Sequence, residues 1–127
     1  MTSAAGQDVV RGAHLPVYGE MDISLDTLPL TGGTTACEAL WRAAPVTTLA
    51  GTSLYERISH SLFNNCGLAD LSTTTVDAFV ARAVDLAADR RRLPDWRANG
   101  RGAIIGGPLG DQRQFAEDFY RPATAAP

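Results

Sequence analysis

Hydrophobic runs bounded by turn residues indicate two short strands in the first half of the chain. Residues 22–27 form the first run, and residues 46–50 form the second, which lies between Pro45 and Gly51. Short apolar runs that are closed on both sides by turn formers are typical of buried strands. A glycine-containing loop and a helix separate the two runs, over residues 29–44. The order strand, loop, helix, strand predicts a βαβ unit with parallel strands.

Helical spacing of apolar residues dominates the rest of the chain. It predicts helices at residues 53–65, 74–87, 93–105 and 111–120, with a short strand at residues 68–71 between the first two. In the first of these helices the residues expected to face inward are Leu54, Ile58, Leu62 and Phe63. In the second they are Val76, Phe79, Val80, Ala83, Val84 and Ala87.

Length and composition indicate one globular domain. The chain has 127 residues, of which 45% are hydrophobic and 20% charged, enough for a single buried core. We expect a disordered tail at residues 1–12, an α/β domain at residues 13–121 and a frayed C-terminus at residues 122–127. The two cysteines, Cys37 and Cys66, lie in no CxxC pair or Cys/His cluster, so no metal site is predicted.

Charge and hydropathy exclude two classes of partner. The formal net charge is -3, which argues against a nucleic-acid binder held by a basic patch. No stretch approaches the ~18–20 apolar residues of a membrane span. We therefore expect a cytoplasmic protein that binds neither nucleic acid nor membranes.

The loop Gly32-Gly33-Thr34-Thr35 is the strongest candidate for a binding function. It follows a predicted strand and opens a predicted helix, where free backbone N–H groups and the helix dipole attract anions. Glycines let a phosphate approach the backbone closely, and Thr hydroxyls add donors. The same residues also fit an ordinary turn, because Thr35 and Glu38 have the spacing of a capping box. Local pattern alone leaves both interpretations open.

Glu38 and His14 are two further candidates. Glu38, one turn into the helix, either accepts hydrogen bonds from ribose hydroxyls or closes the cap on Thr35. His14, in a loop before the first strand, either contacts a base or is simply solvated. The chain shows no Ser/His/Asp set and no paired carboxylates with a cleft role, so no catalytic residue is assigned.

Three runs of the sequence together resemble the C-terminal catalytic region of the O-GlcNAc transferase / SPINDLY family. They are MDISLDTLP at residues 21–29, GGTTACEALW at residues 32–41 and PVTTLAG at residues 45–51. The resemblance is dense over residues 14–51 and then weakens, but it continues over residues 13–121.

The resemblance implies a fold and a function. The family's catalytic region is a GT-B pair of Rossmann-like halves, and this chain corresponds to a partial C-terminal half, a Rossmann-like parallel sheet flanked by helices. Family members transfer N-acetylglucosamine from UDP, or fucose from GDP, to Ser or Thr of proteins. The positions that match the family's nucleotide-sugar-binding residues are His14 at the base, Thr34 and Thr35 at the diphosphate and Glu38 at the ribose, together with Gly33 directly before the two threonines.

The chain also departs from the family pattern. Val17 stands where animal members have an Arg near the base, Gly33 stands where they have a His, and the chain has no Lys for the donor phosphates. The first catalytic half and the repeats that usually precede it have no counterpart. We therefore expect a metal-independent donor-binding portion that is incomplete and inactive alone. Its partners would be the nucleotide sugar and either a protein acceptor or a complementing N-terminal catalytic half.

Two alternatives to a transferase portion remain. The first is a non-enzymatic nucleotide-binding or protein-interaction module derived from that family. The second is a generic α/β domain whose glycine loop is only a turn. The sequence does not choose between UDP-GlcNAc and GDP-fucose.

Overall fold

The structure, a computed structural model, describes residues 15–124, apart from the side chain of residue 123. The tail expected at residues 1–12 and the candidate His14 lie outside these residues. Along the chain the elements are η2 (Leu15–Glu20, a 3-10 helix), β1 (Ser24–Leu25), α1 (Thr34–Trp41), β2 (Val46–Leu49), η3 (Leu54–Glu56), α2 (Ile58–Asn65), η4 (Ala69–Leu71), β3 (Ser72–Thr73), α3 (Val76–Ala88), α4 (Arg92–Gly106) and α5 (Gln112–Thr124).

The three strands form a parallel sheet in the order β1-β2-β3. Ser24 pairs with Val46 between the first two strands, and Thr48 pairs with Ser72 between the second two. Helix α1 connects β1 to β2 and helix α2 connects β2 to β3, which is the crossover that parallel neighbours require. The α/β class and the parallel βαβ unit expected from the sequence are confirmed.

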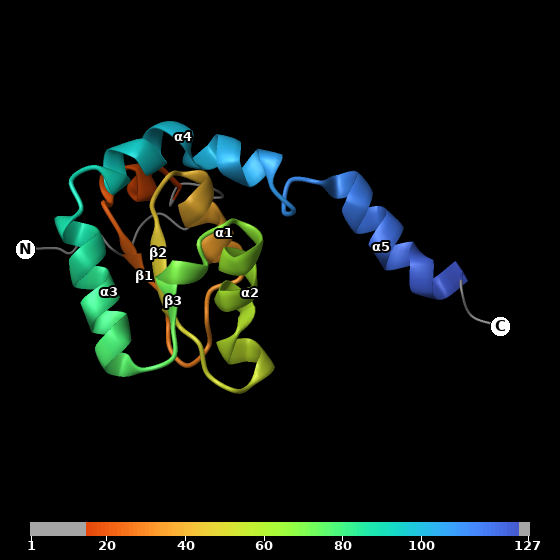
Figure 1. The fold of residues 1–127 in the computed structure, drawn as a ribbon, viewed down its shortest axis with the longest axis horizontal. Helices are drawn as coiled ribbons and strands as arrows, with labels where there is room; N and C mark the ends of the chain where they lie inside the picture. Colours follow the sequence, from red (N-terminus) through yellow and green to blue (C-terminus); the bar gives the residue numbers. More distant parts are fainter. Residues whose placement is uncertain (1–14, 125–127) are drawn as a thin grey trace, which may run out of the picture.

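Helices cover both faces of the sheet. α1 and α2 lie on one face, α3 lies on the other, and α4 runs across one end (Figure 1). Phe63 on α2 and Leu40 on α1 are 0% and 1% exposed, and burying one such side chain stabilises the fold by about 1.5–3 kcal/mol. The buried core consists of Ala39, Leu40, Ala44, Val46, Phe63, Cys66, Leu68, Leu71 and Leu86.

Residues 53–65 do not form one continuous helix. The 3-10 turn η3 ends at Glu56, and α2 begins only at Ile58. The Glu56 carboxylate accepts the backbone N–H of Ser53 at 2.8 Å, which is a capping-box contact that starts η3. This local cap is a stronger determinant of the chain's path than the helical spacing of the apolar residues.

The inward residues of α2 were predicted in part. Phe63 is 0% exposed as predicted and Ile58 and Leu62 are half-buried, but Leu54 lies in η3 and is 85% exposed. Ser59, which was not expected to face inward, is also 0% exposed. This serine has a specific polar partner, described below.

The inward face of α3 is narrower than predicted. It includes Phe79 and Ala83, which are half-buried, and Leu86, which is buried, and it packs on β2 and β3. Short strands offer a helix only one stripe to bury. The prediction is therefore wrong for the four residues outside that stripe, which are exposed: Val76, Val80, Val84 and Ala87.

The short strand predicted at residues 68–71 is displaced toward the C-terminus. Residues Ala69–Leu71 form the turn η4, because the N–H of Leu71 donates to the carbonyl of Leu68 at 2.9 Å. Strand β3 then occupies Ser72–Thr73. Leu68 and Leu71 are buried as predicted for apolar residues, but they reach the core from a turn.

Helix α4, predicted at residues 93–105, is confirmed, and it anchors the end of α1. Arg101 on α4 donates from Nε and Nη2 to the carbonyl of Trp41, at 3.2 and 3.1 Å. Its guanidinium carbon lies 4.7 Å from the centroid of the Trp41 ring. One arginine thus satisfies a C-terminal carbonyl of α1 and packs on its last side chain.

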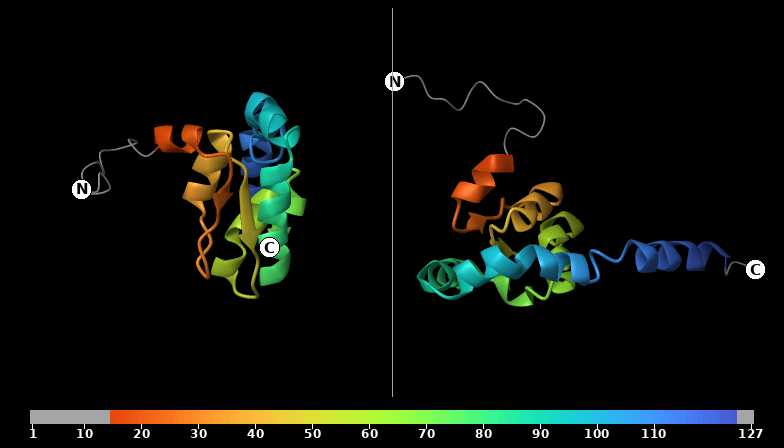
Figure 2. Two further views of the ribbon diagram at one scale, coloured as in Figure 1. Left: turned by 90° about the vertical axis from the view of Figure 1, so that its left-hand side faces the viewer. Right: turned by 90° about the horizontal axis from the view of Figure 1, so that it is seen from above.

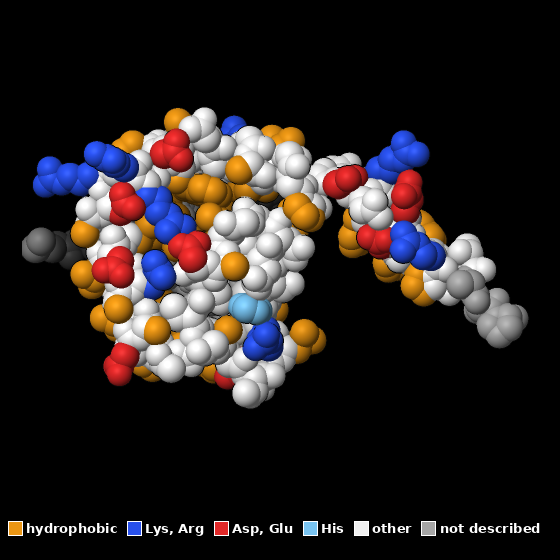
Figure 3. All heavy atoms as spheres, viewed as in Figure 1, with side chains coloured by type: hydrophobic (Ala, Val, Ile, Leu, Met, Phe, Trp, Pro, Cys, Tyr) orange, Lys and Arg blue, Asp and Glu red, His pale blue; other side chains and the backbone are white. Residues whose placement is uncertain are grey.

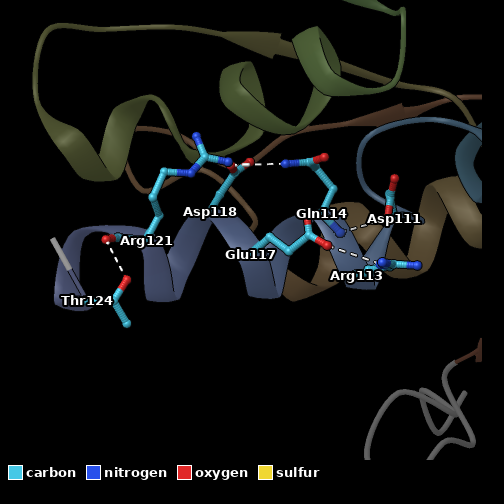
Figure 4. A network of polar contacts seen from close by, with 7 residues as sticks. All are labelled: Asp111, Arg113, Gln114, Glu117, Asp118, Arg121 and Thr124. Atoms are coloured by element: carbon cyan, nitrogen blue, oxygen red, sulfur yellow. Dashed lines mark hydrogen bonds and ion pairs between the residues drawn. The ribbon is translucent and has the colours of Figure 1, made fainter.

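Helix α5 projects away from the rest of the described chain (Figure 2). One side carries a ladder of polar contacts, Arg113 to Glu117, Gln114 to Asp118 and Arg121 to Asp118 (Figure 4). Hydrophobic side chains gather along the other side (Figure 3). The helix continues to Thr124, four residues beyond its predicted end at residue 120. Within residues 15–124, every helix is too short or too polar to cross a bilayer.

Candidate functional site

The N-terminus of α1 is the centre of the candidate site. The capping residue is Gly33, with φ −77° and ψ −83°, and no side chain within residues 15–124 closes the cap with a hydrogen bond. Thr34 and Thr35 are the first two helical residues, and both are exposed. The capping box predicted between Thr35 and Glu38 is therefore wrong, because an N-cap residue lies before the helix and Thr35 lies within it. The first N–H groups of α1 are left without a side-chain cap.

Asp26 holds the glycine loop from the strand side. Its Oδ1 accepts the backbone N–H groups of Thr27 at 3.0 Å and Gly32 at 2.8 Å. Its Oδ2 accepts the hydroxyl of Thr48 on β2 at 2.7 Å. A β-carbon at Gly32 would clash with Thr35 Oγ1 and lie 3.1 Å from Asp26 Oδ1, so a larger residue there would displace the Thr35 side chain. The loop therefore packs tightly on the end of β1.

Residues of α2 and η3 hold the same loop from the other side. Ser59 Oγ donates to the carbonyl of Gly32 at 2.7 Å. Thr31, which is 3% exposed, donates through Oγ1 to the carbonyl of Tyr55 at 2.9 Å. The backbone N–H of Thr31 donates to the same carbonyl at 3.1 Å. The N–H and the carbonyl of Gly32 are therefore both fixed, the first by Asp26 and the second by Ser59. Thr31, the residue before Gly32, is fixed by Tyr55.

Three of the four described site residues lie around two hollows beside α1. Thr34 and Glu38, one turn apart, line a hollow of about 520 Å³ together with Leu15, the residue that follows His14. Thr35 lines a second hollow of about 240 Å³. Gly33 is half-buried and lines neither of these two. A larger hollow of about 740 Å³, between α4 and α5, contains none of the predicted residues.

Glu38 sets the charge of the larger of these two hollows. Burial and then the Glu38 carboxylate raise the pKa of the Cys37 thiol, and the same two causes raise the pKa of the Tyr18 hydroxyl. The carboxylate therefore lies within electrostatic reach of both groups. A carboxylate suits the hydroxyls of a sugar, whereas phosphate oxygens are drawn to the helix N-terminus. The arrangement can hold an anion at the start of α1 and a hydroxyl-bearing group one turn further on.

Two residues that organise the loop, Asp26 and Ser59, were not among the sequence-predicted site residues. Asp26 had a usable signal, because it directly precedes the turn that ends at Pro29, and Asp side chains commonly bond to turn backbone. Ser59 had none, because its partner lies 27 residues away and its neighbours predict an apolar helix face.

Three comparisons with known proteins agree on one family. Residues 3–119 match the family model of glycosyl transferase family 41. The chain is similar to the probable UDP-N-acetylglucosamine–peptide N-acetylglucosaminyltransferases SPINDLY of Hordeum vulgare, 39% identical, and Arabidopsis thaliana, 38% identical, over 85% of this chain and 12% of each relative. It is also similar to the solved structure of a mutant O-GlcNAc transferase of Thermobaculum terrenum, with 31% identity and a TM-score of 0.71 over 84% of this chain and 21% of that one.

These matches extend well beyond the glycine loop. They cover most of this chain but only 12% of the length of the curated relatives. The resemblance to the O-GlcNAc transferase / SPINDLY family is confirmed, and the chain belongs to glycosyl transferase family 41.

Proposed function

We propose that this chain is the C-terminal donor-binding portion of a cytoplasmic protein O-glycosyltransferase. The reaction of the whole enzyme would transfer N-acetylglucosamine from UDP, or fucose from GDP, to Ser or Thr of a protein. The chain would form part of the nucleotide-binding half of a GT-B catalytic region. Alone it would bind the donor without transferring the sugar, because the remaining wall of the cleft would come from another polypeptide segment.

The start of α1 is the observation that carries this proposal. Its cap residue Gly33 has no side chain, Thr34 and Thr35 are exposed, and Glu38 lies one turn away. A diphosphate would accept hydrogen bonds from the first N–H groups and the threonine hydroxyls, and the ribose hydroxyls would donate to Glu38. Each charge-assisted bond contributes about 1.5–3 kcal/mol, and association costs about 4 kcal/mol or more. A part-formed cleft should therefore bind UDP or GDP with a Kd of about 1 mM.

We further propose that the donor diphosphate is held without a metal ion. The helix N-terminus supplies partial positive charge and oriented donors, which are the groups that stabilise a leaving diphosphate. EDTA should leave the affinity for UDP or GDP unchanged in a calorimetric titration. A dependence of that affinity on added Mg²⁺ would contradict the metal-free site.

Calorimetry with UDP, GDP, UDP-GlcNAc and GDP-fucose tests the donor site. The chain should bind one nucleotide and its sugar, and the double variant Thr34→Ala with Thr35→Ala should lose most of that affinity. Thr74→Ala removes an exposed threonine before α3 and is the matched control, with unchanged affinity expected. Each titration should reach a ligand concentration about ten times a Kd of 1 mM. If none of the four shows a heat of binding, the donor-site proposal fails.

A protein-interaction module is the second candidate function, and helix α5 favours it. Phe115, Phe119 and Tyr120 are 70%, 65% and 63% exposed on one side of this helix. The ring centroids of the two phenylalanines lie 6.1 Å apart. Exposed aromatic rows of this kind are common at protein interfaces. If the chain binds no nucleotide, the protein-interaction module becomes the better explanation of its function.

A further inference from the structure

A buried serine on α2 controls the orientation of one peptide group at the start of α1. Ser59 is 0% exposed, and its hydroxyl donates to the carbonyl oxygen of Gly32 at 2.7 Å. The Gly32 carbonyl and the Gly33 N–H belong to the same planar peptide group. In a trans peptide these two groups point in opposite directions. A carbonyl held toward α2 therefore turns the Gly33 N–H away from α2.

The Gly33 N–H is the first backbone donor of the candidate anion site. The N–H of Gly32 is already taken by Asp26, at 2.8 Å. Within residues 15–124 the Gly33 N–H has no acceptor, whereas the carbonyl of Gly33 accepts the N–H of Cys37 at 3.1 Å. The direction of this one N–H thus depends on the contact that the preceding carbonyl makes with Ser59.

Glycine on both sides makes this peptide group easy to reverse. A half-turn of the Gly32–Gly33 peptide would take φ of Gly33 from −77° to about +100°, a region that glycine enters freely and other residues avoid. A reversed peptide would point the Gly32 carbonyl outward, where its negative oxygen repels a phosphate. The serine bond at 2.7 Å holds the peptide in the orientation that presents the donor.

We propose that Ser59 is a positioning residue of the donor-diphosphate site. It does not touch the nucleotide; it fixes the peptide group whose N–H does. Ser59 is itself held, because its backbone N–H lies 3.4 Å from Thr31 Oγ1 and its helix packs in the core through Phe63. The inference rests on the proposed function, since it concerns the affinity for UDP or GDP.

The first test compares Ser59→Ala with a matched control. Ser59→Ala removes the hydroxyl and should weaken UDP or GDP binding about tenfold, the loss of one charge-assisted hydrogen bond. Thr73→Val removes another partly buried hydroxyl, which donates to the carbonyl of Thr48 at 3.1 Å, and should leave the affinity unchanged. Ser59→Cys replaces the hydroxyl with a somewhat larger thiol that is a weaker donor, and should weaken binding in the same direction if Ser59→Ala does not fold.

The second test restricts the peptide directly. A β-carbon at Gly33 would meet Ile58 Cγ2 at 3.4 Å, which is ordinary contact, and alanine disfavours the positive φ of the reversed peptide. In the Gly33→Ala background, Ser59→Ala should therefore change the affinity by less than about twofold. The Gly33 amide signal should shift on nucleotide binding in the wild type and much less in Ser59→Ala.

The outcomes separate the two proposals. A wild type that binds neither UDP nor GDP overturns the proposed function, and this inference with it. A wild type that binds while folded Ser59→Ala binds equally well overturns the role of Ser59 alone. An equal loss of affinity in the wild-type and Gly33→Ala backgrounds also overturns it, because Ser59 would then act through general stability.

Discussion

Asp26 Oδ1 accepts the backbone N–H of Gly32 at 2.8 Å, and this bond joins the end of β1 to the glycine loop. The other carboxylate oxygen accepts the hydroxyl of Thr48 at 2.7 Å, so one side chain ties two strands and the loop together. A donor that is used inside the protein is no longer free for a ligand. The candidate anion site therefore begins at Gly33 and not at Gly32.

Substitutions at Asp26 should separate its bonding from its charge. Asp26→Ala leaves the Gly32 N–H and the Thr48 hydroxyl without their acceptor, and should lower the free energy of unfolding by about 1–3 kcal/mol and weaken UDP or GDP binding. Asp26→Asn keeps an oxygen for Gly32, and its amide can donate to Thr48 Oγ1. It also removes a negative charge close to the phosphates, so its affinity should equal or exceed that of the wild type. Thermal unfolding and calorimetry measure both effects, and an Asn variant as weak as the Ala variant contradicts the account.

Glu38→Gln should distinguish ribose recognition from diphosphate recognition. Loss of the carboxylate weakens the hydrogen bonds from ribose hydroxyls, so the affinity for UDP or GDP should fall about tenfold. Inorganic pyrophosphate, which has no ribose, should bind the variant as well as the wild type or better. Glu117→Gln neutralises a carboxylate on α5 and should change neither affinity. Equal losses for nucleotide and pyrophosphate would rule out the ribose contact.

Two adjacent threonines on β2 should respond to the same substitution with opposite signs. Thr47 and Thr48 are both 0% exposed, but among the described residues Thr47 Oγ1 has no hydrogen-bond partner, whereas Thr48 Oγ1 donates to Asp26. Thr47→Val should raise the free energy of unfolding by about 1 kcal/mol, because it removes a buried hydroxyl without a partner. Thr48→Val should lower it by about 1–3 kcal/mol, because it strips a partner from Asp26. Urea unfolding of both variants checks the signs, and two changes of equal sign would contradict the hydrogen-bond assignment.

Asp70 should make a small, pH-dependent contribution to stability. Its hydrogen bonds to Arg92, the shorter at 2.6 Å, are the main cause that lowers the pKa of this carboxyl below the usual 3.8. A lowered folded-state pKa adds stability above the unfolded value, and that stability disappears as the pH falls through the folded value. The Asp70 side chain is 44% exposed, so the contribution at pH 7 is about 0.2–1 kcal/mol.

Urea unfolding at two pH values tests this contribution. Asp70→Asn should be less stable than the wild type at neutral pH, and the difference should shrink as the pH falls below 3.8. Asp77→Asn, on the exposed first turn of α3, is a control without an ion pair to Arg92. A difference between wild type and Asp70→Asn that persists unchanged in acid would mean that the carboxylate charge is not its cause.

Local sequence rules predicted the first βαβ unit well because each boundary has a chemical marker. Pro45 and Gly51 bracket β2, and the glycines before Thr34 mark the start of α1. The rules failed for Leu54, which lies in η3, and for part of the face of α3. Apolar spacing favoured Leu54 and Val80 as inward residues, and the structure leaves both exposed. Which stripe a helix buries depends on the width of the sheet opposite it, and that width is not a local property.

The candidate site was predictable only in part. Thr34, Thr35 and Glu38 stand at the start of α1, as the family pattern implies, but their contacts with a nucleotide remain predictions. The residues that hold the loop lay beyond sequence reasoning, because Ser59 reaches Gly32 from another element. A serine among apolar residues on a helix face can donate to many acceptors, and the sequence does not show which one it meets in the folded chain.

Amide mapping of nucleotide binding tests the central claim most directly. The full chain, labelled with nitrogen-15, would be titrated with UDP and then with GDP. The account predicts that one nucleotide shifts the amide signals of Gly33, Thr34 and Thr35, while those of Phe115 and Phe119 on α5 stay in place. No shift with either nucleotide at several times the expected Kd of about 1 mM, or shifts confined to elements other than the start of α1, would contradict it.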